Sequence, residues 1–462
     1  MILQNVIVPG LVDDTSELYI RGNNYIIENN ILRISVNGRI SSNTYENILD
    51  MYMWKTYTNV KDISLNLMLS GKGKISIFKG KSSDSDIVVQ KEFDTKEISL
   101  ITIDMRQIKM DQIWFEIVAE GEVEIYSASY VTGELPQQEI YLTTVITTYK
   151  RKEMVERNIE QIKNSLLIKE GRLQLKVVDN GRQLRNRYGS DVRLYRNRNT
   201  GGSGGFKRGM EETVKCLNEF PTTNVILMDD DVEFSNEIFI RIFALLSFQK
   251  KEYLDEVIAG RMFREDNKSI QYTAVEKWNG GDLIHIGGNT DMRIEENLEA
   301  VNDRQNGEYS GWWLAVFPIE FIKNNKPLPF FLHCDDVEFG LRHGGNPIII
   351  NGVHVWHETY EHRQSPIVTY YDTRNSLIVN EMYESSKVIE EHRQGIIKMI
   401  IEVHNLKQWE NKAALVLAVF SNKKDTKMGK IKLINCILIR YGIIFNPVIS
   451  IIFRYLGRNI NK

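Results

Sequence analysis

The chain has 462 residues, of which 42% are hydrophobic and 26% are charged, and its formal net charge is −3. This length predicts two or three domains, and the composition excludes a disordered protein. The charge argues against nucleic acid as the main partner, because nucleic-acid-binding surfaces are strongly basic. Three widely separated cysteines, and an N-terminus without the basic start of a signal peptide, predict a cytoplasmic protein.

Residues 1–135 are expected to form a β-rich domain. Short segments in which apolar and polar residues alternate are separated by Gly, Asn, Asp and Ser, as in strands joined by turns. These segments lie at 31–36, 63–69, 74–78 and 113–118. Strands of this length and spacing favour a β-sandwich of the jelly-roll kind.

From residue 136 to 384 the pattern changes to strands that alternate with helices. The predicted strands lie at 140–147, 173–178, 192–195 and 224–228, and the predicted helices at 152–167 and 206–219. This alternation predicts right-handed crossovers and an α/β domain with a mostly parallel sheet.

Residues 385–462 have longer helical patterns. Within them, 430–458 form an apolar stripe that lysines and arginines flank or interrupt. We expect this segment either to pack as an ordinary helix or subunit contact, or to lie on the inner face of a membrane as a peripheral contact.

An acidic triplet, Asp229-Asp230-Asp231, follows the apolar strand predicted at 224–228. Ligands bind at the carboxyl ends of strands in open α/β sheets, and two carboxylates one residue apart can hold a hard divalent cation. The alternative is a solvated strand-end turn or a helix N-cap.

A glycine-rich segment at 199–209 follows the third predicted strand of this domain. Glycines let the backbone approach a ligand closely, and the helix expected after them would direct free N–H groups at an anion. The segment lacks the order of a P-loop and of a dinucleotide-binding loop. The alternative is a flexible loop without a ligand.

Two later segments carry further candidate side chains. Asp335 and Asp336 stand at the head of a predicted helix, where a carboxylate with a raised pKa can act as a general base, although acids in a first helical turn are also common as caps. In the strand around Val355, His354 and His357 face opposite sides, and either is a metal-ligand candidate or a hydrogen-bonded core histidine.

Three tryptophans, Trp278, Trp312 and Trp313, are candidates for a sugar-stacking platform. The apolar C–H face of a sugar ring stacks well on an indole. The alternative is core packing, which is the commoner use of tryptophan pairs.

Taken in order, these motifs resemble the family 2 glycosyltransferases with an A-type fold, and among them the bacterial galactofuranosyltransferases. The matching elements run from Thr147 to His357, about half the chain. The resemblance implies an N-terminal β-sandwich, a Rossmann-like nucleotide-sugar domain and a C-terminal helical region. The chain has two consecutive tryptophans where the mycobacterial polymerases carry three.

The resemblance also implies a role for each matching residue. The donor nucleotide sugar would be bound by Thr147, Arg151, Asp179, Asn199, Gly201, Gly202, Asp229 and Asp230. The metal, Mn²⁺ or Mg²⁺, would be held by Asp229, Asp231 and His357. Asp336 would be the catalytic base, Asp335 would place the acceptor, and Trp278, Trp312 and Trp313 would line the acceptor groove.

We therefore expect an inverting, metal-dependent enzyme that transfers a sugar, galactofuranose above others, from a UDP-sugar to a bacterial glycan or lipid-linked glycan acceptor. The same resemblance allows a rhamnosyltransferase or another hexosyltransferase. Two other classes stay open: a carbohydrate-binding protein with a degenerate transferase domain, and a nucleotidyltransferase. The sequence also leaves undecided whether the chain forms a homo-oligomer.

Overall fold

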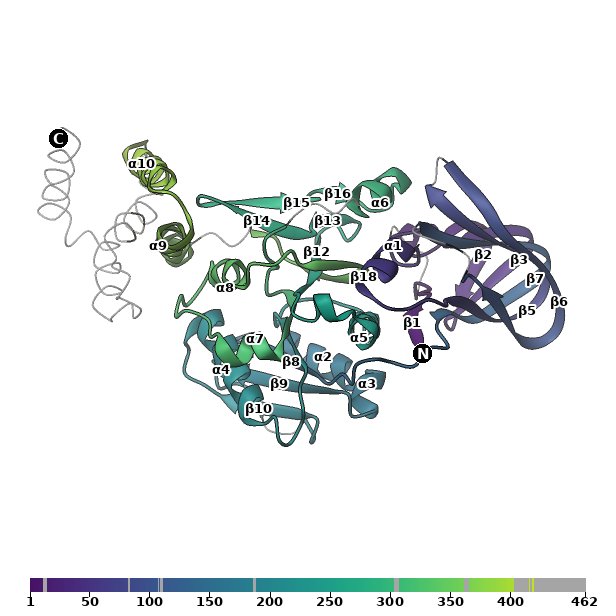
Figure 1. Ribbon diagram of the computed structural model, residues 1–462, viewed down its shortest axis with the longest axis horizontal. Helices are drawn as coiled ribbons and strands as arrows, with labels where there is room; N and C mark the ends of the chain where they lie inside the picture. The colour runs from purple at the N-terminus through teal and green to yellow at the C-terminus, as the bar shows by residue number, and fades with distance from the viewer. Residues whose placement is uncertain are drawn as a thin grey trace, which may run out of the picture.

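The computed structural model describes residues 1–402, apart from 11–14, 82–83, 107, 109–110, 186–187, 303–306 and 361–364, together with 415 and 418. Figure 1 shows an elongated molecule, with the N-terminal strands at one end, a sheet flanked by helices in the middle, and α9 and α10 at the other end.

The N-terminal part is one antiparallel sheet of seven strands in the order β2-β3-β7-β5-β6, with β1 and β4 paired to β7. Its elements are β1 (Ile2–Asn5), η1 (Ser16–Leu18), β2 (Arg21–Glu28), β3 (Ile31–Ser41), β4 (Leu49–Asp50), α1 (Met51–Tyr57), β5 (Ser64–Lys81), β6 (Asp84–Asp104) and β7 (Gln112–Val131). The β-rich prediction is confirmed in outline. The two strands predicted at 63–69 and 74–78 are a single strand, β5.

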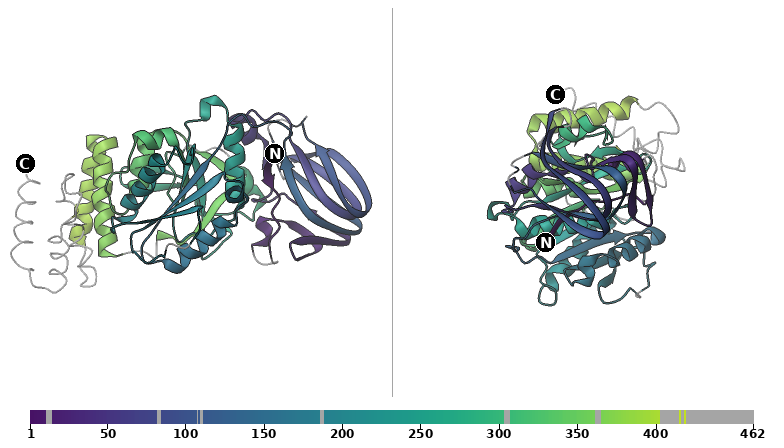
Figure 2. Two further views of the ribbon diagram at one scale, coloured as in Figure 1. Left: turned by 90° about the horizontal axis from the view of Figure 1, so that it is seen from below. Right: turned by 90° about the vertical axis from the view of Figure 1, so that its right-hand side faces the viewer.

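The long strands of this sheet bend strongly (Figure 2). The Nζ of Lys91 lies 3.5 Å from the carbonyl oxygen of Thr102 on the same strand, although eleven residues of straight strand would span roughly 36 Å. The pairing of β5 shifts register at Gly71, which has a φ of +113°, and we assign the bend of β5 to this position. Side chains on both sides of the bend, such as Leu67 and Ile75, are fully buried in one apolar cluster. All seven strands are hydrogen-bonded into one sheet, so the division into two sheets stays a prediction.

The central part contains a nine-stranded sheet in the order β10-β9-β8-β11-β17-β12-β13-β16, with β18 paired to β12. Its strands are β8 (Leu142–Thr148), β9 (Leu173–Asp179), β10 (Val192–Arg196), β11 (Asn224–Met228), β12 (Ile258–Arg264), β13 (Ile270–Thr273), β16 (Thr290–Asp291), β17 (Leu314–Pro318) and β18 (Ile348–His357). β14 (Val275–Asn279) and β15 (Asp282–Ile286) form a separate hairpin. The first four strands are parallel as predicted, whereas β17 runs antiparallel to both of its neighbours.

Helices cover this sheet and extend beyond it (Figure 1). They are α2 (Lys152–Lys163), α3 (Leu166–Lys169), α4 (Gly201–Lys215), α5 (Glu237–Phe248), η2 (Lys251–Tyr253), α6 (Glu295–Asn302), α7 (Ile319–Asn324), α8 (Asp335–His343), α9 (Pro366–Tyr383) and α10 (Ser386–Glu402). α4 begins at Gly201 rather than at the predicted 206, so most of the glycine-rich segment is helical. None of the described helices is long and apolar enough to cross a membrane. The apolar stripe at 430–458 lies outside the described residues.

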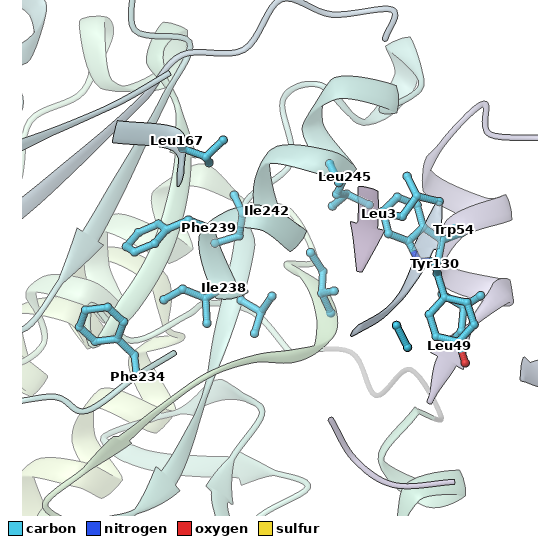
Figure 3. Close-up of a cluster of buried hydrophobic side chains, with 14 of the residues drawn as sticks. Leu3, Leu49, Trp54, Tyr130, Leu167, Phe234, Ile238, Phe239, Ile242 and Leu245 are labelled. Atoms are coloured by element: carbon cyan, nitrogen blue, oxygen red, sulfur yellow. The ribbon is translucent and has the colours of Figure 1, made fainter. Parts of the chain in front are cut away.

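Helix α5 joins the N-terminal sheet to the central sheet. Its buried face carries Ile238, Ile242 and Leu245, spaced as on one side of a helix. Figure 3 shows these side chains in one apolar cluster with Leu3 of β1 and Trp54 of α1. The two sheets therefore share a continuous hydrophobic core.

A buried arginine on the same helix adds polar contacts across this junction. Arg241 has no exposed surface and donates to the carbonyl oxygens of Glu46 (2.8 Å) and Asn351 (2.7 Å) and to the carboxylate of Glu237 (3.2 Å). Glu237 in turn accepts from the backbone and side chain of Asn5 at 2.7 and 2.8 Å. A buried arginine is stable only when its donors are matched in this way.

Candidate active site

The strand directions bring the candidate side chains to one edge of the central sheet. β11 and β12 both run antiparallel to β17, and β18 runs parallel to β12, so β11 and β18 point the same way. The acidic triplet follows the end of β11, and His357 is the last residue of β18. A backbone bridge between Glu233 and Trp356 then joins the two strand ends directly.

The three predicted metal ligands lie together. The Nε2 of His357 is 3.1 Å from a carboxylate oxygen of Asp231 and 3.7 Å from one of Asp229. One ligand atom from each residue lies within 4.8 Å of the other two, and Asp231 and His357 are buried. Two carboxylate oxygens and one imidazole nitrogen form a donor set that suits Mn²⁺ or Mg²⁺. This is the one such group among the residues that the structure describes.

Arg151, the residue before α2, neutralises part of this acidic group. Its Nη1 lies 3.0 Å from the carboxylate of Asp230 and 3.1 Å from that of Asp231. Burial raises the pKa of Asp230, the charge of Asp231 raises it further, and Arg151 opposes both effects. The arginine side chain is about two fifths exposed, so it can also reach an anionic ligand placed beside the acids.

Asp179 ends β9 and has no exposed surface. Its carboxylate accepts from the backbone N–H of Gly181 (2.9 Å) and of Leu184 (2.8 Å). These bonds fix the turn after the strand, which accounts for the buried charge without a ligand. The predicted contact with the nucleotide stays a prediction.

The glycines of α4 serve first as close-packing positions. A Cβ at Gly205 would lie 1.8 Å from the hydroxyl oxygen of Thr147, and one at Gly201 would lie 1.8 Å from the carbonyl oxygen of Phe331. The side chain of Asn199 accepts from the N–H of Gly201 at 3.1 Å. The expected flexible or ligand-binding loop is therefore mostly a helix that packs tightly on β8.

The first turn of α4 also reaches the acids of α8. A Cβ at Gly202 would lie 3.9 Å from a carboxylate oxygen of Asp335. A role for Asn199, Gly201 and Gly202 in binding a nucleotide sugar stays a prediction.

Asp335 and Asp336 occupy the first turn of α8, as predicted. Burial raises the pKa of Asp335 to about 6. Burial also raises the pKa of Asp336 well above its ordinary value, and the charges of Asp335, Glu276 and Asp229 add to this effect. Because the charge of Asp229 contributes to this rise, the metal-ligand candidates and the base candidate lie near enough for their charges to interact.

The three tryptophans are buried, with exposures of 5% for Trp278, 4% for Trp312 and 9% for Trp313. Trp278 donates from Nε1 to the side chain of Asn380, and Trp313 to the carbonyl oxygen of Gly260, both at 2.8 Å. Trp312 packs edge-on against two phenylalanine rings. This burial favours a packing role, and acceptor binding by the tryptophans stays a prediction.

Glu276 on β14 is a residue of this site that the sequence did not single out. It is 3% exposed, its carboxylate lies 2.8 Å from Nδ1 of His285, and its charge acts on both Asp336 and Tyr309. The available signal was an acidic residue on the buried face of an alternating strand, next to Trp278. Alternation alone does not indicate which face is buried in a two-stranded hairpin.

Comparisons with known proteins agree with the motif pattern. The family model described as "Galactofuranosyltransferase 2 N-terminal" matches residues 3–133. Galactofuranosyltransferase GlfT2 of Mycobacterium tuberculosis is 23% identical over 386 residues, covering 76% of this chain and 60% of that protein. GlfT2 of Mycolicibacterium smegmatis is 22% identical over 407 residues, covering 80% and 62%. The chain thus spans about three fifths of the length of these relatives.

Solved structures give looser matches. A structure of S. aureus TarS 1–349 is 11% identical with a TM-score of 0.37, covering 66% of this chain and 88% of that one. GalNAc-T7 with UDP, GalNAc and Mn²⁺ is 12% identical with a TM-score of 0.41, covering 66% and 59%. These values are too low to support an argument about fold or activity. The sequence matches do support one conclusion: the chain resembles the galactofuranosyltransferases, as its motifs predicted.

Proposed function

We propose that this chain is an inverting, metal-dependent glycosyltransferase that moves galactofuranose from UDP-galactofuranose to a glycan acceptor. The observation that carries the proposal is a pair of acidic groups whose charges interact. One group, Asp229 and Asp231 with His357, has the donor atoms of a metal site. The other, Asp336, has a pKa raised by burial and by the first group's Asp229. The galactofuranosyltransferase relatives support the choice of donor.

The three ligand candidates fit Mn²⁺ or Mg²⁺ in number and type of donor atom. When bound, such an ion supplies Lewis-acid stabilisation of the charge that develops on a departing diphosphate. The protein adds Arg151, whose guanidinium already contacts two of the acids and is partly exposed. Arginine suits phosphate recognition because its planar fork matches the oxygens. We assign it to the diphosphate of the donor.

Asp336 is the proposed general base. In a single displacement, an acceptor hydroxyl forms a bond to the anomeric carbon while the bond from that carbon to the diphosphate breaks, and the configuration inverts. The hydroxyl proton passes to the carboxylate of Asp336, and the bonding electrons leave with UDP. A carboxyl group with a raised pKa is a stronger base than an ordinary aspartate, which favours this proton transfer.

The rival functions differ in what they need from the site. A rhamnosyltransferase or another hexosyltransferase would use the same groups with another donor. A carbohydrate-binding protein would need neither a group of candidate metal ligands nor a carboxyl group with a raised pKa, and the presence of both supports the transferase. A nucleotidyltransferase would use the aspartate pair but gives no role to Asp336.

A donor panel tests the proposal. Purified protein is incubated with UDP-galactofuranose, UDP-galactopyranose, UDP-glucose and dTDP-rhamnose, with Mn²⁺ or with EDTA, and release of the nucleotide is measured. We expect release from UDP-galactofuranose with Mn²⁺ and none with EDTA. Release from another donor alone would reject the galactofuranose assignment, and the absence of release and of Mn²⁺-dependent UDP binding would reject the transferase.

The setting of the reaction is also part of the proposal. We propose a lipid-linked or polymeric bacterial glycan as acceptor and a cytoplasmic enzyme that contacts the inner membrane face through its C-terminal segment. Co-sedimentation of the full chain with vesicles that contain anionic lipid tests the contact. Sedimentation of the chain to the same extent with and without vesicles would reject the membrane contact.

A further inference from the structure

The backbone that leads into α8 has an unusual conformation. Phe331, His333 and Cys334 have φ values of +75°, +64° and +59°, in the left-handed region that residues with a side chain rarely adopt. Cys334 is the N-cap of α8, so this segment sets where Asp335 and Asp336 stand. Strained backbone of this kind persists only where surrounding contacts enforce it, and it gathers at functional sites.

One buried side chain supplies the main polar contact to this segment. The amide nitrogen of Asn375, on α9, lies 3.1 Å from the carbonyl oxygen of Phe330, 2.6 Å from that of Leu332 and 2.9 Å from that of His333. Asn375 has no exposed surface. Its own oxygen accepts from Arg374 at 2.6 Å, which fixes the orientation of the amide.

Packing confines the segment from two sides. The ring of Tyr371, also on α9, stacks on the ring of Phe331 with a centroid distance of 4.9 Å. On the opposite side, the first residue of α4, Gly201, approaches the carbonyl oxygen of Phe331 so closely that a Cβ would not fit. The hydroxyl of Ser203 on α4 donates to the carbonyl oxygen of Leu328. The segment is therefore held between α4 and α9.

We propose that Asn375 is a positioning residue for the catalytic base. Its amide donates to three carbonyl groups of the segment that contains the left-handed residues. These bonds fix the first turn of α8, where Asp336 would accept the proton of the acceptor hydroxyl. This inference rests on the proposed function, because it takes Asp336 as the base. It gives α9 a part in catalysis through the backbone of the segment that precedes α8.

Asn375→Ala and Asn375→Ser test the proposal. Alanine removes both N–H donors of the Asn375 amide. Serine keeps one hydroxyl donor and is the second variant should the alanine variant fail to fold. The matched control is Asn47→Ala in the turn between β3 and β4 of the N-terminal part. Asn47 is likewise fully buried and holds a loop through bonds of 2.7 Å to Ile7 and Tyr19.

Two readouts separate positioning from loss of stability. We expect kcat for transfer to fall roughly 10- to 100-fold in Asn375→Ala, because a shift of about 1 Å at a catalytic group has effects of this size. KM for UDP-galactofuranose and the Kd of UDP should stay within about twofold of the wild-type values. The residues proposed to bind the diphosphate and the metal lie on other elements than α9. Amide hydrogen exchange should rise at 331–337 in the Asn375 variants and stay unchanged there in Asn47→Ala.

Other outcomes would overturn the inference. A folded Asn375→Ala with the kcat of the wild type would do so, and so would equal loss of kcat in Asn375→Ala and Asn47→Ala. Hydrogen exchange tests the inference independently of activity. Unchanged exchange at 331–337 in both Asn375 variants would mean that the Asn375 amide does not hold this segment. A wild-type chain that neither releases nucleotide from any donor nor binds UDP in the presence of Mn²⁺ rejects the proposed function. The exchange experiment still tests which backbone segment Asn375 holds.

Discussion

Replacing Asp336 with asparagine is the most direct test of the proposed base. The two side chains have nearly the same shape, and the oxygen that accepts from the N–H of Val337 at 2.8 Å is kept, so the start of α8 should not move. What is lost is the ability to accept a proton. General-base assistance contributes about 10²–10⁴-fold to a rate, which corresponds to roughly 3–5 kcal/mol.

We expect the loss of kcat in Asp336→Asn to lie toward the upper end of this range. Burial and the neighbouring charges raise the pKa of Asp336, so its deprotonated form is a stronger base than an ordinary carboxylate. Transfer is measured at saturating Mn²⁺ and acceptor, and UDP binding is measured by calorimetry on the same preparations. We expect kcat to fall by at least about 10³-fold with an unchanged Kd for UDP. Retention of a tenth of the activity, or parallel loss of UDP binding, would refute the assignment.

The pH dependence gives a second arm of the same test. Asp336 must be deprotonated to act, so activity should be lost as the pH falls through its raised pKa. Because the charge of Asp335 is one cause of that raised pKa, Asp335→Asn should lower the pKa of Asp336 and move the acidic limb of the kcat/KM profile to lower pH. A limb that stays in place in Asp335→Asn would mean that another group titrates.

Three further predictions concern the metal site, α4 and the junction of the sheets. Asp231→Ala should abolish the gain in UDP affinity that Mn²⁺ gives, and calorimetry with and without Mn²⁺ checks this. Gly205→Ala should destabilise the protein by about 1–3 kcal/mol in urea unfolding, because its Cβ would meet the hydroxyl of Thr147, whereas Gly202→Ala, with one contact at 3.9 Å, should not. Burial raises the pKa of Glu46 to about 8 from 4.5, so its stabilising effect is complete below pH 4.5 and is lost as the pH rises through 8. The Tm should therefore fall between pH 4.5 and 8 in the wild type and less in Glu46→Gln; an equal fall would contradict the assignment.

The sequence predicted the parallel half of the central sheet well because its strands are short segments rich in aliphatic and β-branched residues, set between helical patterns. The strand predicted at 224–228 is β11 itself, and β8 and β9 differ from prediction by one or two residues at an end. The merging of two predicted strands into β5 was missed, because Gly71 at positive φ continues a bent strand but reads as a turn in sequence. The glycines of α4 were misread for a similar reason. A helix seldom tolerates them, and only the close approach of Thr147 explains why Gly205 is there.

The candidate site was predictable where its residues follow strand ends. Asp229, Asp231 and His357 do so, and the topology alone brings such residues to one edge. Residues that act through tertiary contact left no local signal. Glu276 and Asn375 are an ordinary strand acid and an ordinary helix asparagine until the fold places them beside Asp336 and its leading segment.

These tertiary contacts also determine how the N-terminal sheet can be studied. Arg241 bonds to Glu46 in the N-terminal part and to Asn351 on β18, the strand that ends in His357. His354, three residues before His357, packs against the ring of Tyr45 and lies 3.5 Å from the carboxylate of Glu46. The N-terminal sheet thus braces the strand that carries a proposed metal ligand. Deleting residues 1–135 would expose a shared core and unpair Arg241, so lost activity would not reveal a role in acceptor binding. Point substitutions on the exposed face of the bent sheet, far from Arg241, separate the two roles.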